Sequence, residues 1–324
     1  MLTKKNIHKL NRDCYCFPLD REIIDQGFQT RVPEALEQCQ LRENLFAGTG
    51  VLLDSSDVKL MTGVIETIES LVHSKQYLTD KLRRTPLLAE WQRVSGDGMI
   101  MSYDFHINDH GPKLIEVNTN AGGAFVIKEL LSVTESVYPP CCGFGPLAMS
   151  RERLHTMLQT EWISSGREGA PGTAVIVDDN PEEQYLYPDM QIAKNYFEVS
   201  GVKTLIADTH ELKFRNGFLH CRDEVVDIVY NRSTDFTLQS DVNEAMLNAA
   251  LCSAALVAPN PFHHALYADK SNFIDWTDGN RQSAIAIRTI NSTKCFAYSA
   301  SSRDPFAQYG ERCRFVQREK TVVF

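Results

Sequence analysis

The sequence has no run of about 18 apolar residues, the length that a membrane-spanning helix needs. Its first residues, Met-Leu-Thr-Lys-Lys-Asn-Ile-His, lack the apolar stretch of a signal peptide. We therefore expect a cytoplasmic protein with no membrane partner. The net charge is −9, and no basic stripe is present that a phosphate backbone would attract, so we also expect no nucleic-acid partner.

The nine cysteines do not form a recognisable framework. Their number is odd and their spacings are irregular, which is typical of reduced thiols rather than of disulfides. Cys14-Tyr-Cys16 and Cys141-Cys142 lack the paired spacing of a zinc site. A chain of 324 residues with 43% hydrophobic residues is otherwise ordinary for a globular protein and is long enough for two packed units.

The clearest local pattern is a predicted β-hairpin. Residues 99–106 and 113–118 are apolar-rich runs of strand length, and the sequence Asn-Asp-His-Gly-Pro, typical of turns, lies between them. We predict that the turn is centred on His110.

This register places polar side chains together. It sets Asp104 opposite Glu116 and Ser102 opposite Asn118, and because side chains alternate along a strand, both carboxylates and the amide share one face. Two carboxylates about 5 Å apart repel by roughly 3 kcal/mol at an effective dielectric constant near 20. A cation is therefore expected between them, and Mg²⁺ suits a small set of oxygen ligands. The alternative is a solvent-facing hairpin with ordinary surface acids.

The hairpin is followed by Asn120-Ala-Gly122-Gly123. Glycine lets the backbone approach a ligand closely, so we expect Asn120, Gly122 and Gly123 to contact whatever binds there.

At these residues the chain resembles the ATP-grasp superfamily, and in particular its circularly permuted branch of glutathionylspermidine synthetase-like enzymes. That branch carries an Asp, a Glu twelve residues later and an Asn two further on, and Asp104, Glu116 and Asn118 match this pattern. The resemblance implies that the three residues hold Mg²⁺ on ATP. The family's Arg, which contacts the acceptor phosphate, is replaced in this chain by Ser102.

The second half of the chain alternates predicted strands and helices. It begins after the polar, glycine-rich residues 164–172, and an Asn-Gly pair at Asn216 predicts a type I′ hairpin. We expect Asp178-Asp179, just before Pro181, to cap the following helix. Such alternation indicates a partly parallel sheet with sites at the carboxyl ends of its strands.

We predict an α/β (α+β) fold, with an ATP-grasp-type domain and a small Rossmann-like subdomain. Residues 1–165 are predicted to form an N-terminal helical region and the metal-site hairpin. Residues 172–278 form the Rossmann-like part, and 279–324 form an atypical basic tail with eight basic and three acidic residues.

Two cationic residues of the second half are candidates for phosphate or carboxylate contacts. Arg232 follows a predicted strand and is our candidate catalytic residue, although a surface pair with Asp235 is the alternative. The resemblance implies that Lys270 reaches ATP phosphates, although a solvated surface lysine is the alternative. His263 and His264 are more typical of packing at a helix entry.

The order of these parts matches the permuted branch, because Glu116 precedes Lys270. The family continues with a second ATP lysine and a glycine-rich loop, and neither appears. We expect a C-terminal truncation or a shifted reading frame from about residue 279. Codons for Phe315–Phe324, read one base later, can encode Leu-Cys-Ser-Ala-Arg-Lys-Leu-Leu-Phe-Phe, which resembles the missing lysine strand.

The resemblance implies an ATP- and Mg²⁺-dependent ligase that activates a small-molecule carboxylate as an acyl phosphate and transfers it to an amine. It names no substrate, and the oligomeric state stays open. Three alternatives remain: an inactive remnant, a non-catalytic small-molecule binder on the α/β half, and a two-carboxylate hydrolase. The last of these needs sugar-lining aromatics, and the chain has only three Trp.

Overall fold

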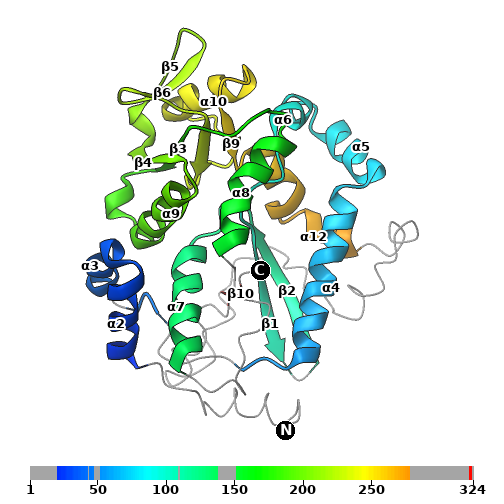
Figure 1. The fold of residues 1–324 in the computed structure, drawn as a ribbon. Helices are drawn as coiled ribbons and strands as arrows, with labels where there is room; N and C mark the ends of the chain where they lie inside the picture. The colour runs from blue at the N-terminus through cyan, green and yellow to red at the C-terminus, as the bar shows by residue number, and fades with distance from the viewer. Residues whose placement is uncertain are drawn as a thin grey trace.

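The computed structural model describes six ranges of the chain, traced from blue to red in Figure 1: residues 20–42, 44–46, 52–108, 110–137, 151–277 and 321–322. No helix within these ranges is long and apolar enough to cross a membrane. The fold is a mixed α/β arrangement with both parallel and antiparallel sheets, as the sequence predicted.

The α-helices of the described ranges are α2 (Arg21–Arg31), α3 (Pro33–Leu41), α4 (Ser55–Val72), α5 (Lys75–Arg84), α6 (Leu88–Val94), α7 (Ala124–Val137), α8 (Arg151–Ser164), α9 (Tyr187–Val199), α10 (Glu244–Leu251), α11 (Pro261–His263) and α12 (Asn272–Thr277). Short helical turns of other types are η3 (Pro181–Glu183), η4 (Thr209–Glu211), η5 (Asp241–Asn243) and the π-helical η6 (His264–Ala268).

The strands are β1 (Ser102–Asn108), β2 (Gly111–Asn118), β3 (Thr173–Asp178), β4 (Lys203–Asp208), β5 (Leu212–Arg215), β6 (Phe218–Cys221), β7 (Glu224–Val225), β8 (Ile228–Asn231), β9 (Leu256–Ala258) and β10 (Thr321–Val322).

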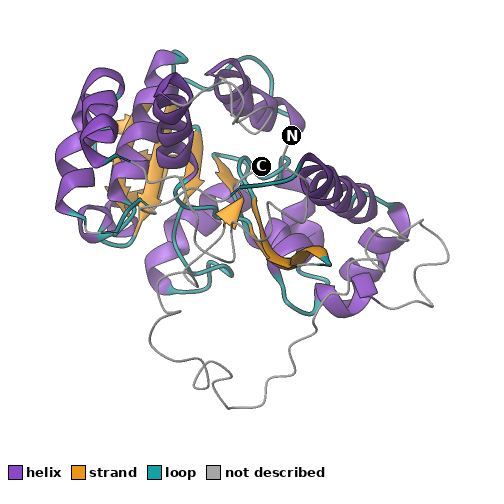
Figure 2. Cartoon of the chain, turned by 90° about the horizontal axis from the view of Figure 1, so that it is seen from below, coloured by secondary structure: helices purple, strands orange, loops and turns teal. Residues whose placement is uncertain are grey.

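The predicted Rossmann-like part contains a parallel sheet in the order β4-β3-β8-β9, flanked by helices (Figure 2). Alternate residues of β3 enter different cores, as the two-residue period of a strand requires. Ala174 and Ile176 pack with α9, whereas Val175 and Val177 join a cluster that includes α10. The sheet is therefore buried on both faces.

Beside this sheet, β5, β6 and β7 form a small antiparallel sheet. The turn between β5 and β6 has Asn216 at φ 54° and Gly217 at φ 81°. Two consecutive positive φ values are what a type I′ turn requires, so the predicted hairpin is confirmed.

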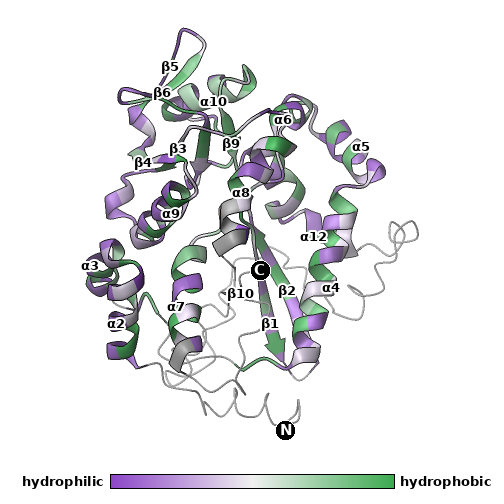
Figure 3. Ribbon diagram, viewed as in Figure 1, coloured by the Kyte–Doolittle hydropathy of each residue, from purple (hydrophilic) through white to green (hydrophobic). Residues whose placement is uncertain are grey.

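The N-terminal half is built around the hairpin of β1 and β2, which lies between α4 and α7 in Figure 1. The side of α4 that carries Met61, Val64 and Ile68 is buried in one cluster with the apolar face of the hairpin. Figure 3 shows hydrophobic and hydrophilic segments alternating along α4, the pattern of a helix with one buried side.

Both hydrophobic clusters contain residues from each side of the predicted boundary at residues 164–172. One joins α4, β1 and β2 to Val175 and Val229 of the parallel sheet. The other joins α2 and α7 to Ile176 and Tyr230. The hairpin and the parallel sheet are thus packed against shared apolar cores.

Of the predicted basic tail, only Thr321 and Val322 are described. They form β10, which pairs antiparallel with β1 and sets Thr321 opposite Asp104. The frameshift interpretation otherwise concerns residues that lie outside the described ranges.

Candidate functional site

The hairpin brings its polar residues together in the predicted register. Asp104 lies opposite Glu116, and Ser102 lies opposite Asn118. The Asn118 amide nitrogen donates to Asp104 Oδ2 at 3.4 Å and to Glu116 Oε1 at 3.3 Å. One amide therefore bridges the two carboxylates.

A β-bulge explains how this register arises. Asn108 pairs with Gly111 and Phe105 with Leu114, so the turn is centred half a residue before His110. Ile115 is the extra residue, exposed and without a directly opposite partner. This extra residue shifts the register by one position on β2, so Asp104 lies opposite Glu116, as a turn centred on His110 would also have placed it.

The bulge also sorts the side chains between the two faces. Tyr103, Phe105 and Val117 are buried in the core shared with α4. Asp104, Glu116 and Asn118 are half-buried on the opposite face. The carboxylates are thus held by a buried framework, while water still reaches part of their surface.

Lys270 reaches the same face from far along the chain. It lies in the turn between η6 and α12, and η6 packs beside β2. Its Nζ is 3.8 Å from Glu116 Oε2, and 84% of its side chain is exposed. The structure therefore gathers four predicted residues, Asp104, Glu116, Asn118 and Lys270, in one place.

Glu69 of α4 links these two segments, and no pattern in the sequence indicates this role. Its carboxylate accepts hydrogen bonds from the Tyr103 hydroxyl at 2.7 Å and the Tyr267 hydroxyl at 2.8 Å. Burial is the main cause that raises the pKa of both phenols, and the charge of Glu69 raises it further. Each phenol therefore keeps its proton and stays a hydrogen-bond donor. Tyr103 adjoins Asp104, and Tyr267 lies three residues before Lys270.

Arg232 is placed differently from the four hairpin-site residues. It is only 6% exposed, and its Nη1 donates to the carbonyl of Asn120 at 3.2 Å and to that of Ala121. The Tyr230 hydroxyl also donates to Ala121, at 3.4 Å. Arg232 thus fastens residues 120–121 to the end of β8, and its predicted catalytic role stays a prediction.

The alternative of a surface pair between Arg232 and Asp235 is wrong. Arg232 is buried, and Asp235 accepts instead from Thr237, Ser240 and Asn243. These hydrogen bonds arise because the chain turns back toward η5, where the donors surround the carboxylate.

The predicted glycines follow the loop that Arg232 holds. A Cβ on Gly122 would lie 2.4 Å from Leu186 Cδ1 and 2.7 Å from Arg232 Nη2, so only glycine fits there without movement. Gly123 has φ +85° and leads into α7. In this structure Gly122 makes room for protein atoms, and ligand contact by Asn120, Gly122 or Gly123 stays a prediction.

Asp189 of α9 also lies near Arg232 and Gly122, in what we call the closed region. Its Oδ1 accepts from the backbone N–H groups of Phe125 and Val126, at 2.8 and 2.9 Å, in the first turn of α7. Burial raises the pKa of Asp189, while Arg232 and these N–H groups oppose the rise. The carboxylate thus helps to satisfy donors at a helix start that would otherwise be buried unpaired.

Asp178 ends β3, beside the end of β8 that carries Arg232. Burial raises its pKa to about 6. The predicted cap is wrong, because the Asp178 carboxylate accepts from Asp179 N–H, whereas α9 begins after Leu186 with no side-chain cap. The chain first forms η3, and this places the acids too far from α9 along the sequence.

Comparisons with solved structures bear on the fold. The chain is similar to a glutathione synthetase-like effector from Globodera pallida, in its apo form, with a TM-score of 0.53 and 15% identity over 86% of this chain and 72% of that one. The chain therefore shares the mixed α/β fold of this glutathione synthetase-like protein.

A putative gamma-glutamylcysteine synthetase from Methylobacillus flagellatus KT also matches, with 11% identity over 75% of this chain and 53% of that one. Its TM-score of 0.34 is too low to bear on the fold. No family model matches the chain, and no curated protein matches it.

Within this fold, the oxygen ligands on the hairpin suit a hard cation. No group of three or more His, Cys, Asp or Glu side chains placed to hold a metal is present in the described ranges. The hairpin offers two carboxylates and one amide, from Asp104, Glu116 and Asn118, which is a smaller ligand set than such a group. A small set suits Mg²⁺, because this ion keeps several waters and takes further oxygens from phosphates. Rotation of the Asn118 amide would turn its oxygen toward such an ion.

Proposed function

We propose that the chain is an ATP- and Mg²⁺-dependent carboxylate–amine ligase of the ATP-grasp type, of the permuted branch. One observation carries the proposal: Asp104, Glu116 and Asn118 share one hairpin face, and the Lys270 ammonium lies 3.8 Å from Glu116. Two carboxylates with a nearby cation suit a magnesium–phosphate ligand, since each charge finds an opposite one.

Asp104, Glu116 and Asn118 would hold Mg²⁺, which when bound supplies positive charge that stabilises the transferred phosphoryl group. Lys270 has enough exposed side chain to move from Glu116 onto a phosphate oxygen. Its ammonium would then offset the negative charge that shifts onto the departing ADP.

The two steps of this ligase reaction need no nucleophilic side chain of the protein. A substrate carboxylate oxygen attacks the γ-phosphorus of ATP, the bond to ADP breaks, and an acyl phosphate forms. An amine nitrogen then attacks the acyl carbon, phosphate leaves, and the amine loses a proton. Positioning and charge neutralisation carry the catalysis, which agrees with the lack of a Ser-His-Asp or Cys-His signature.

The test is ADP release from ATP in the presence of Mg²⁺ and pools of amino acids and polyamines. We expect ADP release to depend on the added amino acids and polyamines. Its rate should fall by about tenfold or more in D104N, E116Q and K270M. E168Q, in the exposed turn after α8, is the matched acid control and should behave as the wild type.

Different failures have different meanings. Mg-ATP binding without ADP release would remove the ligase activity and keep the nucleotide site. The absence of Mg-ATP binding would overturn the proposal and favour an inactive remnant. A small molecule that binds the wild type and E116Q equally would favour a non-catalytic binder built on the α/β half.

A further inference from the structure

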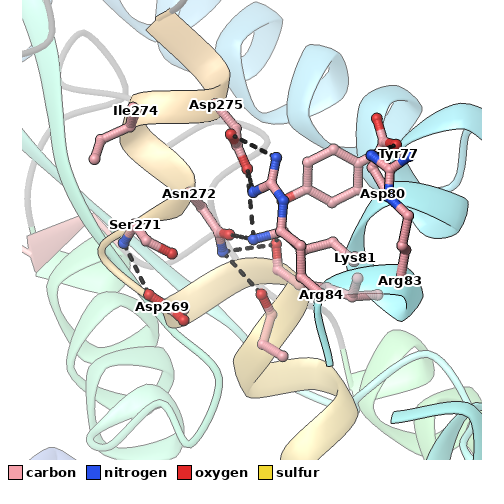
Figure 4. Close-up of polar contacts among 12 residues, drawn as sticks. Tyr77, Asp80, Lys81, Arg83, Arg84, Asp269, Ser271, Asn272, Ile274 and Asp275 are labelled. Carbon is pink, nitrogen blue, oxygen red and sulfur yellow. Dashed lines mark hydrogen bonds and ion pairs between the residues drawn. The ribbon is translucent and has the colours of Figure 1, made fainter. Parts of the chain in front are cut away.

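The turn that carries Lys270 is attached to α5, more than 180 residues earlier in the chain. Figure 4 shows side chains of α5 directed at the segment from η6 to α12, with Lys81 and Asn272 facing each other. Lys270 itself contacts the hairpin, so whatever fixes this segment also fixes Lys270 relative to Glu116.

Lys81 is unusually buried for a lysine, with 7% exposure. Its Nζ donates to Asn272 Oδ1, lies 3.7 Å from Asp275 Oδ2 and sits 5.5 Å from the centre of the Tyr77 ring. Burial lowers its pKa, while the charges of Asp275 and Asp269 oppose that fall. A lysine this buried is costly unless its donors are used, and here Asn272 and Asp275 use them.

The Lys81 contact determines how the Asn272 amide is turned. A lysine ammonium only donates, so the amide must present its oxygen to Lys81 and its nitrogen to the other side. There Nδ2 donates to the carbonyls of Ala265 at 3.1 Å and Leu266 at 3.0 Å. Asn272 therefore joins the start of α12 to η6, the two ends of the turn that holds Lys270.

Other hydrogen bonds close the turn. The Asn272 N–H donates to the Asp269 carbonyl at 2.9 Å, and the Ser271 N–H donates to Asp269 Oδ1 at 2.8 Å. The Tyr77 hydroxyl adds a bond from α5 to the Leu266 carbonyl at 3.2 Å.

We propose that Lys81 is a positioning residue: acting through Asn272, it holds the turn that presents Lys270 to a phosphate ligand at the hairpin. This inference rests on the proposed function. Lys81 reaches that ligand only through Asn272 and the turn, and its buried charge gives the turn one fixed conformation.

The same interface offers a matched control. Arg84, also on α5, donates to Asp275 Oδ2 at 2.8 Å, and its side chain is 41% exposed. Arg84→Met removes a charge between α5 and α12 but leaves the bond from Lys81 to Asn272 in place. A merely structural role of the interface would make both variants alike.

The experiment compares the wild type, K81M, K81R and R84M by two readouts. One is hydrogen exchange of the amides in residues 266–273, and the other is the dissociation constant of Mg-ATP by calorimetry. For K81M we expect faster exchange in this segment and about tenfold weaker Mg-ATP binding, as for other residues that orient a binding group. K81R, which keeps a donor, should restore both, and R84M should leave the affinity within about twofold.

The following results would overturn the positioning role of Lys81 or the proposed function. Unchanged exchange at residues 266–273 in K81M, or faster exchange with unchanged Mg-ATP affinity, overturns the positioning role. Equal loss of affinity in K81M and R84M also overturns it, because the effect would then be general destabilisation. A wild type that binds no Mg-ATP overturns the proposed function itself, which separates that failure from the others.

Discussion

The predicted site residues fall into two regions that differ in how their polar atoms are used. At the hairpin, Asp104, Glu116 and Asn118 are half-buried and linked by contacts of 3.3 to 3.4 Å. At the end of β8, Arg232 is buried and its Nη1 donates to the carbonyls of residues 120 and 121. The same residue types can thus serve a ligand or a loop, and burial with internal partners separates the two uses.

This difference predicts that substitutions in the closed region lower stability, whereas those at the hairpin lower ligand binding and spare stability. The closed region holds Arg232, Asp189, Asp178 and Gly122. The open region holds the hairpin acids and Lys270.

The largest effect is expected for Arg232→Met. It leaves the Asn120 carbonyl without its Arg232 donor and the Ala121 carbonyl with only the Tyr230 hydroxyl, and it removes the positive charge near the buried Asp189 carboxylate. The free energy of unfolding should therefore fall by about 3 kcal/mol or more. Urea denaturation measures it, with Arg215→Met on the exposed end of β5 as the control. A stable Arg232→Met protein that has lost activity would instead restore the predicted catalytic role of Arg232.

Asp178 should make stability fall as pH rises. Its pKa is raised from 3.8 to about 6, so the folded protein keeps a proton that the unfolded chain loses. The contribution is fully present below pH 3.8 and is lost as pH rises through 6. Between pH 4 and pH 7 the wild type should lose about 2 kcal/mol relative to D178N in urea denaturation. An equal difference at both pH values would mean that the carboxyl is solvated.

Gly122→Ala should cost about 1–2 kcal/mol, because the new Cβ overlaps Leu186 and Arg232. Thermal unfolding measures the loss. Leu186→Ala removes the nearer contact, so the double variant should lose less than the sum of the two single variants. Strict additivity would show that the close approach does not exist in solution.

The smallest change in stability is expected for Glu116→Gln, under about 1 kcal/mol in urea denaturation. It relieves repulsion from Asp104 and gives up a contact with the exposed Lys270, and such contacts contribute little. A loss as large as that of Arg232→Met would place Glu116 with the closed region.

Local chemistry made the hairpin predictable. The turn-forming residues and the alternation of side chains were enough to pair Asp104 with Glu116, although the bulge at Ile115 was not foreseen. The type I′ turn at Asn216-Gly217 and the parallel sheet followed from equally local signals.

Contacts between distant segments could not be predicted in this way. Glu69 meets Tyr267, Lys81 meets Asn272, and Arg232 meets the carbonyl of Asn120 across more than 100 residues each. No spacing in the sequence encodes such pairs, because they arise only when the hairpin, α5 and the parallel sheet pack together. The burial of Arg232 has the same origin.

The most direct test of the open hairpin face is a calorimetric titration of Mg-ATP into the wild type and E116Q. We expect the wild type to bind and the omission of Mg²⁺ to weaken binding. E116Q should bind more weakly by about tenfold or more, while its unfolding is unchanged. Equal binding by both proteins, or none by the wild type, would contradict this expectation.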